Sequence, residues 1–223
     1  MLLIDKYITL CYGITSLAAC VQHRRYFFRS GFMLQHTGTQ TIQTARLTLR
    51  KIRPEDSADF FTLCSKPAVS RFVTWNTHES KEVTDALVQG WVQSYRDDRY
   101  LWAIVYRDRV IGNVDVINIT GAVAELGWML DEAFWNQGLM TEAASAVRDY
   151  LFDTVGLEAL TACHVAENFG SGRVMQKIGM HFWKYIAFSN KAIPKLYGKR
   201  LCVYCLTKEE WEAMRRRSSS LTV

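Results

Sequence analysis

The pattern of apolar and polar positions identifies the first regular elements of the chain. Residues 45–52 (ARLTLRKI) alternate between the two kinds and predict a strand. Pro54 follows with two acidic residues in the next turn, where negative charge suits a helix dipole, so residues 54–66 are predicted to be a helix. A second helix is predicted to begin near residue 76, because an apolar stripe recurs every four residues at Val83, Leu87 and Trp91.

Three apolar runs separated by short polar turns come next. Residues 100–106 and 110–118 predict two strands joined in a hairpin by Arg107-Asp108-Arg109, and residues 123–130 predict a third strand. These three runs therefore indicate an antiparallel part of a sheet.

Helices and strands then alternate toward the C-terminus. A helix is predicted after the polar turn at residues 136–138 and ends before Gly156, and residues 158–165 predict a strand. Asn168 caps another helix, which Gly179 stops. Two last strands are predicted at 181–188 and 199–206. The order of elements predicts one α/β domain, whose antiparallel start passes into strand–helix–strand units.

Composition narrows the class of protein. The chain has 223 residues, enough for one domain of moderate size with additional terminal segments. Its net charge of +5 is concentrated at the ends: residues 1–32 carry +3, residues 215–217 carry +3, and the segment between them carries −1. A body without net positive charge argues against nucleic-acid binding.

Cysteine usage indicates the compartment. The six cysteines are scattered, which fits a reducing environment, so a cytoplasmic location is expected. Cys202 and Cys205 form a CxxC inside a strand-like run, without the second ligand pair and the turn that a zinc site uses. No metal is therefore expected.

The two ends of the chain differ from its middle. Residues 7–21 are uncharged but too short for a comfortable transmembrane helix, and the basic residues after them oppose export. Residues 1–42 are predicted to be an extension, poorly ordered or helical, or the product of an upstream start with Met33 as the true one. A membrane-surface anchor is the functional alternative. Residues 213–223 are predicted to be a basic tail, which leaves 43–212 as the folded domain.

The turn 136-NQGLMT-141 is the first candidate for chemistry. The chain contains neither the GxxxxGK[ST] of nucleoside-triphosphate loops nor the GxGxxG of dinucleotide folds. What remains is a short turn whose backbone N–H groups open a helix, and whose Gly138 permits close approach of a ligand. Such a turn suits a pyrophosphate, although many polar turns before helices are purely structural.

A second segment supports a family resemblance. Residues 165–180 (VAENFGSGRVMQKIGM) resemble the second conserved helix of the GNAT N-acetyltransferase superfamily. FWNQGLMTEA resembles the acetyl-CoA pyrophosphate loop of the RimJ/RimL branch, residues 46–60 its first strand and helix, and 125–130 its fourth strand. The matches in the helix are Asn168, Ser171, Val174, Lys177, Gly179 and Met180. Trp135, Asn136 and Met140 differ from the residues that the family usually has in this loop. These differences concern side-chain contacts to phosphate, whereas the backbone contacts do not depend on them.

The resemblance implies a fold and a cosubstrate. It implies an α/β GNAT fold with a mixed, mostly antiparallel central sheet of about seven strands flanked by about four helices. It also implies acetyl-CoA, with its pyrophosphate on the loop and its pantetheine arm along residues 128–130 like an added strand. The implied cofactor-binding residues are Trp128, Met129, Leu130, Asn136, Gln137, Gly138, Leu139, Met140, Thr141, Asn168 and Ser171.

The catalytic candidates each have a structural alternative. By resemblance, Ser171 protonates the leaving thiolate, because Met175 stands where many GNAT enzymes have a tyrosine; alternatively it bonds backbone in the first helical turn. Glu125 is the first candidate for the base, or else the partner of a neighbouring arginine. His164 has a suitable pKa for proton transfer, but a structural or substrate-side role is favoured. Asn168 binds cofactor or caps its helix.

The acceptor side is the least specified. Trp75 and His78 are expected to line the amine pocket, and the acceptor is a primary amine of a protein N-terminus or a small molecule. A GNAT-fold CoA sensor without turnover is the alternative function, and a membrane-tethered protein is a third that rests on residues 7–21. A monomer or homodimer is expected, with no nucleic-acid partner.

Overall fold

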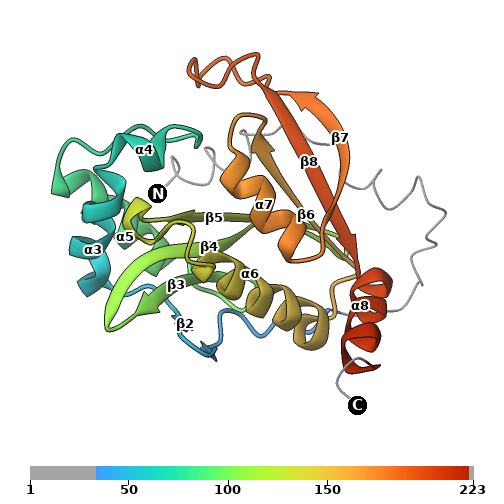
Figure 1. Cartoon of the computed structure of the whole chain (residues 1–223). Helices are drawn as coiled ribbons and strands as arrows, with labels where there is room; N and C mark the ends of the chain where they lie inside the picture. Colours follow the sequence, from blue (N-terminus) through green and yellow to red (C-terminus); the bar gives the residue numbers. More distant parts are fainter. Residues whose placement is uncertain (1–33, 221–223) are drawn as a thin grey trace.

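The computed structural model describes residues 34–220, so the anchor considered at residues 7–21 and the alternative start Met33 lie outside the described residues. This part of the chain forms one eight-stranded sheet in the order β1-β2-β3-β4-β5-β6-β8-β7 (Figure 1). Neighbouring strands are antiparallel except for the parallel pair β5–β6. The strands are β1 Ile42–Gln43, β2 Thr48–Arg50, β3 Leu101–Tyr106, β4 Arg109–Thr120, β5 Val123–Leu130, β6 Ala159–Val165, β7 His181–Ala187 and β8 Arg200–Thr207.

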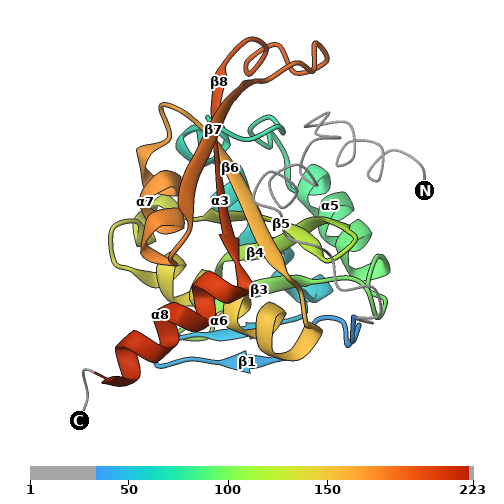
Figure 2. The same ribbon diagram turned by 90° about the vertical axis from the view of Figure 1, so that its right-hand side faces the viewer.

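Helices cover both faces of this sheet. Figure 2 shows α7 and α5 on opposite sides of the strands. The helices are α3 Ser57–Cys64, α4 Pro67–Ser70, α5 Lys81–Gln93, α6 Leu139–Tyr150, α7 Phe169–Lys177 and α8 Lys208–Ser220. Short 3-10 turns η1 (Pro54–Asp56) and η2 (Glu132–Phe134) and a π-helical turn η3 (Leu151–Val155) join them. The predicted mixed, mostly antiparallel sheet is confirmed, with β1 as an additional strand and α4 and α8 as additional helices.

The two largest apolar clusters among the described residues lie on opposite faces of the sheet. On one face, Phe60 of α3 and Trp91 of α5 pack over Leu101 and Ala103 of β3. On the other face, side chains of α6, α7 and α8 pack against the opposite sides of the same strands. Because successive strand residues point to opposite faces, β3, β4 and β5 contribute side chains to both clusters. The site described below lies where this sheet opens between the two layers.

The buried face of α5 differs from the predicted one. The helix begins at Lys81, and its buried residues are Thr84, Val88 and Trp91, whereas the Val83 side chain is 49% exposed. A strict four-residue spacing drifts around a helix of 3.6 residues per turn, while the 84–88–91 spacing stays on one face.

Turn chemistry explains the hairpin and the helix ends. Arg107 and Asp108 have φ angles of 48° and 62°, and Tyr106 pairs with Arg109, so the turn has two residues instead of the predicted three. Two left-handed residues match the twist of the flanking strands. Gly156 and Gly179, with φ of 81° and 91°, terminate their helices as predicted.

Parts of both predicted terminal segments pack against the folded domain. Residues 34–42, assigned to the extension, pack on the sheet: the Thr39 hydroxyl donates to the carbonyl of Arg99 at 2.8 Å and accepts from the amide of Leu101 at 2.9 Å. Residues 213–220, assigned to the tail, are the second half of α8. This helix docks through Trp211, whose indole N–H donates to Asp149 at 2.7 Å. None of the helices within residues 34–220 is long and apolar enough to cross a membrane.

Candidate active site

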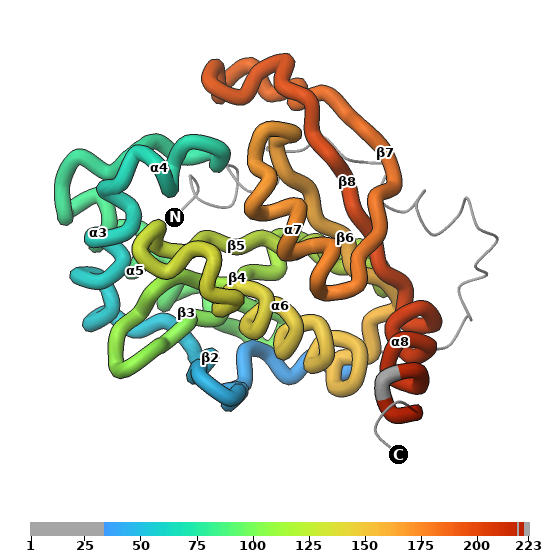
Figure 3. The backbone as a smooth tube through the Cα atoms, in the orientation of Figure 1, coloured from blue at the N-terminus to red at the C-terminus, as the bar shows by residue number. Residues whose placement is uncertain are grey.

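Strands β5 and β6 begin as paired neighbours and then separate. Their parallel pairing runs from Val123 with Ala159 to Leu126 with Ala162 and stops there. Beyond this point β5 continues toward the loop before α6, and β6 continues toward α7 (Figure 3). The separation leaves a notch in the sheet whose edges carry backbone groups without a strand partner.

The direction of the peptide groups along β5 follows from its pairing with β4. The amide of Asp131 donates to the carbonyl of Ile111 at 2.8 Å, and Leu130 lies opposite Gly112. Hydrogen-bonded and non-hydrogen-bonded pairs alternate in an antiparallel ladder, so Met129 is bonded to β4 while Trp128 and Leu130 turn their peptide groups toward the notch. The carbonyl of Leu130 accepts the indole N–H of Trp135 at 2.9 Å. Of the predicted pantetheine contacts, Trp128 and Leu130 thus offer backbone, and Met129 offers its side chain.

The loop before α6 is shaped by two left-handed residues. Asn136 and Gly138 have φ angles of 59° and 75°, and Gly138 is the N-cap residue of α6, with no side-chain cap. The N–H groups that open the twelve-residue helix α6 therefore lack a capping side chain. Arg46 supports the loop by donating to the carbonyl of Gln137 at 3.0 Å and to the Glu142 carboxylate at 2.7 Å.

A groove of about 480 Å³ lies between this loop, β5 and α7. Leu139 and Met140 have buried side chains, so they face the groove through backbone, while Thr141 also lines it. Arg173 and Lys177 add two cationic side chains to its wall. Unpaired N–H groups at a helix N-terminus, together with nearby cations, fit a pyrophosphate. The residues present thus fit the phosphate and pantetheine parts of CoA.

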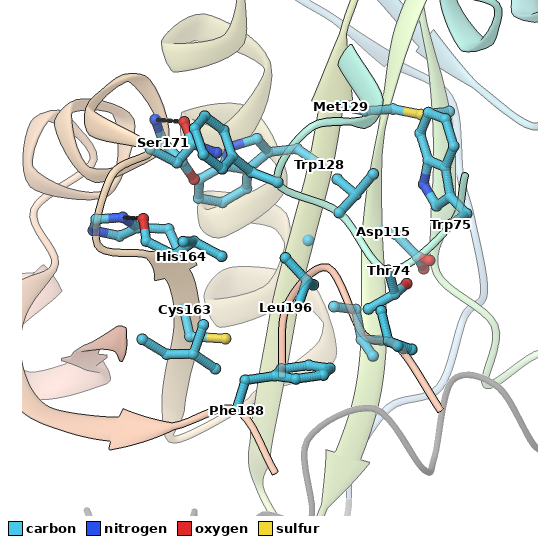
Figure 4. A pocket seen from close by; sticks show the side chains of 18 of the residues that line it. Thr74, Trp75, Asp115, Trp128, Met129, Cys163, His164, Ser171, Phe188 and Leu196 are labelled. Carbon is cyan, nitrogen blue, oxygen red and sulfur yellow. Dashed lines mark hydrogen bonds between the residues drawn. The ribbon is translucent and has the colours of Figure 1, made fainter. Parts of the chain in front are cut away.

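The start of α7 brings Asn168 and Ser171 to the rim of the notch, where Ser171 lies beside Trp128 (Figure 4). The Asn168 side-chain oxygen accepts the backbone N–H of Ser171 at 3.3 Å, so Asn168 is the cap of α7. Within the described residues the Ser171 hydroxyl has no hydrogen-bond partner. Its side chain is therefore available to a ligand.

A second, larger cavity of about 850 Å³ lies on the sheet face that carries α3 and α5. Its floor is formed by alternate residues of three strands: Asn113 and Asp115 of β4, Glu125, Gly127 and Met129 of β5, and Cys163 and Val165 of β6. It shares six lining residues with the groove: Phe72, Val73, Trp128, Met129, Asn168 and Ser171. The two spaces therefore meet at the notch, so a group bound in one can reach a group bound in the other.

Glu125 is the buried carboxyl group of this cavity, with 6% of its surface exposed. No ion pair within the described part of the chain involves it, so the arginine partner considered from the sequence is not present there. The thiol of Cys163 lies 3.8 Å from Oε1. Burial raises the pKa of Glu125 to about 7, with the Cys163 hydrogen bond acting in the opposite direction. Such a carboxyl exchanges a proton readily at neutral pH.

His164 of β6 is a lining residue of the cavity, and within the described residues its Nε2 is buried without a hydrogen-bond partner. Its Nδ1 bonds the carbonyl of Val165 at 2.8 Å, and a Cβ on Gly172 would lie 2.8 Å from Nε2. The ring therefore packs beneath α7, on the face opposite to Cys163. Burial lowers the pKa of His164, which keeps the ring neutral. This placement suits support of α7 better than proton transfer from an amine.

The two predicted acceptor residues have different positions. Trp75 lines the larger cavity (Figure 4). His78 lines neither cavity; its Nδ1 bonds the Thr84 hydroxyl at 2.8 Å, and its ring packs edge-on against Trp75 at 5.4 Å between centroids. Burial lowers the pKa of His78. His78 therefore holds the segment that presents Trp75.

Several cavity residues were not among the predicted site residues, and Asn113, Asp115 and Lys195 are polar or charged examples. The first two alternate with apolar residues in 110-VIGNVDVIN-118, and a polar pair on one face of a strand was the available signal. Lys195 lies in the β7–β8 loop, and nothing in its local sequence indicates that it reaches this site.

These features agree with a known family. The family described as "Acetyltransferase (GNAT) domain" matches residues 46–181, more than half of the chain. The protein belongs to the GNAT acetyltransferases. It is an acetyl-CoA-dependent N-acetyltransferase.

Relatives and solved structures of GNAT proteins extend over most of the described chain. Uncharacterized N-acetyltransferase YoaA of Bacillus subtilis is 29% identical over 143 residues, covering 62% of this chain and 81% of that protein. A GCN5-related N-acetyltransferase from Brucella melitensis superposes with a TM-score of 0.73 at 16% identity, covering 85% of this chain and 89% of the other. RimL, a ribosomal L7/L12 alpha-N-protein acetyltransferase solved in complex with coenzyme A, superposes with a TM-score of 0.65 at 18% identity, covering 75% and 98%.

Proposed function

We propose that this GNAT enzyme transfers the acetyl group of acetyl-CoA directly to a primary amine, of a small molecule or of a protein N-terminus, in the 850 Å³ cavity. The observation that carries the proposal is the shared wall between the groove and the cavity. On the cavity floor stands Glu125, and on the shared rim stands Ser171. A proton acceptor and a proton donor thus flank the place where the two substrates meet.

Acetyl-CoA supplies an activated acetyl thioester when bound. The N–H groups of residues 139–141 and the side chains of Arg173 and Lys177 hold its pyrophosphate. The peptide groups of Trp128 and Leu130 bond its pantetheine arm as a neighbouring strand would. These contacts orient the thioester toward the cavity, and orientation contributes much of the rate gain in such transfers.

Glu125 prepares the amine. An amine arrives mostly as an ammonium ion at neutral pH, and the ionised carboxyl of Glu125 removes one proton, directly or through water. The neutral nitrogen then attacks the acetyl carbonyl, whose oxygen is stabilised by a backbone N–H of β5 at the notch. Ser171 donates its hydroxyl proton to the departing sulfur, the second proton lost by the amine nitrogen restores the Ser171 hydroxyl, and Glu125 releases its proton to solvent. The products are the N-acetylated amine and free CoA.

Two measurements with the full chain test this function. Acetyl-CoA binding is measured by calorimetry, and release of free CoA thiol is followed with and without amines. We expect binding in the micromolar range and thiol release that depends on an amine. Binding without amine-dependent release would favour the alternative, a GNAT-fold CoA sensor. Failure to bind acetyl-CoA would refute the proposed role of the groove.

A further inference from the structure

The acceptor cavity contains a buried amide whose hydrogen-bonding capacity is unused. Asn113 is 5% exposed, lies on the cavity floor, and its side-chain oxygen has no hydrogen-bond partner. Within residues 34–220 no other group bonds its side-chain nitrogen either. Buried polar side chains are normally paired, so an unpaired one in a binding cavity indicates a polar group on the ligand. Since an amide can turn over, it can accept or donate that bond.

The position of Asn113 relative to Glu125 sets the length of the ligand. Asn113 lies opposite Met129 on β5, and Glu125 lies four residues before Met129 on the same strand. At about 3.3 Å per residue, the two positions are about 13 Å apart along the strand. A ligand whose amine reaches Glu125 can therefore present a second group to Asn113 only if that group is several bonds away from the amine.

The walls between these two ends are apolar and aromatic. They include Leu87, Trp91, Trp75, Phe188 and Leu196. Asp115, midway along the floor, is held by the Arg99 guanidinium at 2.7 and 3.3 Å, so it lends little free charge to a ligand. The middle of the cavity therefore suits an apolar body.

The cavity is also bounded by a bridge between two of its lining segments. Lys195 of the β7–β8 loop donates to the carbonyl of Ser70 at 2.9 Å and to the carbonyl of Trp75. Burial lowers the pKa of Lys195. The bridge ties the β7–β8 loop to the segment after α4. A compact molecule fits within the cavity of about 850 Å³.

We propose that the acceptor is a small primary amine with an apolar, ring-sized body and a second hydrogen-bonding group at its far end, and that Asn113 determines this specificity by binding that group. The proposal rests on the proposed acetyl transfer and defines the substrate class of the same cavity. It chooses small molecules over protein N-termini.

The test compares matched amines in the thiol-release assay with the full chain. Tyramine and 2-phenylethylamine form one pair, serotonin and tryptamine another; within each pair the members differ by one ring hydroxyl. A lysine-free peptide with an unblocked N-terminus is the third class. We expect kcat/KM for the hydroxylated member of at least one pair to exceed that of its partner by about 10-fold or more. The peptide should be acetylated more slowly than the hydroxylated amines.

Asn113→Leu, which keeps the volume but removes the amide, should abolish the preference for the hydroxyl. The affinity for acetyl-CoA, whose groove does not include Asn113, should stay within about twofold. Faster turnover of the peptide than of any small amine would overturn the inference while leaving acetyl transfer intact. Equal rates within both pairs in the wild-type enzyme would overturn the role of Asn113. Absence of turnover with every amine would overturn the proposed function itself, and this inference with it.

Discussion

Replacing Glu125 with glutamine should make the protein more stable at alkaline pH and inactive. The carboxyl is buried among the cavity residues, and its pKa is raised to about 7 from 4.5 chiefly by burial. Between these two pKa values the folded protein holds a proton that the unfolded chain has released. The free energy of unfolding therefore falls as pH rises through this window and stays low above pH 7.

The size of this effect follows from the shift. At about 1.4 kcal/mol per pKa unit, the ionised carboxyl lowers the free energy of unfolding by about 3 kcal/mol at pH 8. At pH 5 most of this cost is absent because the folded carboxyl is protonated. Glu125→Gln, which is neutral at both values, should therefore gain about 2 to 3 kcal/mol over the wild type between pH 5 and pH 8.

The assay is urea unfolding of both proteins at pH 5 and pH 8, with the midpoint and slope compared. Glu132→Gln is the matched control, because Glu132 is an exposed carboxylate of η2. It should show the same pH dependence as the wild type. In parallel, kcat/KM of Glu125→Gln should fall by about 100-fold or more with the acetyl-CoA affinity unchanged. The wild-type kcat/KM should rise with pH through about 7.

Two results would refute this reasoning. If the wild type and Glu125→Gln lose stability in parallel from pH 5 to pH 8, the carboxyl of Glu125 does not titrate near 7. If Glu125→Gln retains kcat/KM within a fewfold, the proton is removed by another group.

Three further substitutions test the loop, the rim and the packing of α7. Gly138→Asp should weaken acetyl-CoA binding about 10-fold or more by calorimetry, because its carboxylate would repel the phosphate groups. The control is Gly198→Asp, which also has a φ of 75° but has open space around it and should bind acetyl-CoA like the wild type. Equal losses of affinity in the two variants would contradict the role of the loop. Ser171→Ala should lower kcat about 10- to 100-fold at unchanged Tm and acetyl-CoA affinity, and an unchanged kcat would exclude it as the acid. Gly172→Ala should cost about 1 to 3 kcal/mol in urea unfolding, because its Cβ would meet His164 Nε2 at 2.8 Å, and unaltered stability would show that the ring moves aside freely.

Local sequence determined the features that depend on neighbouring residues. The cap at Asn168, the glycine stops at 156 and 179 and the turn ahead of α6 follow from backbone conformations and hydrogen bonds within a few residues. The element order followed from periodicity for the same reason. The segments with the resemblance, which include the loop and the start of α7, are likewise short and contiguous.

Tertiary structure decided everything that depends on which distant groups meet. Periodicity placed Glu125 and His164 on strands, but only strand order and register showed that one is buried beside Cys163 and the other lies beneath Gly172. Similarly, the sequence marked residues 213–223 as a basic tail, whereas residues 213–220 continue α8, whose Trp211 bonds Asp149 sixty-two residues earlier. A side chain's pKa and availability depend on burial and on partners far away in the chain. For this reason the sequence by itself determined the family and the loop, while the folded structure decided which residues face the amine.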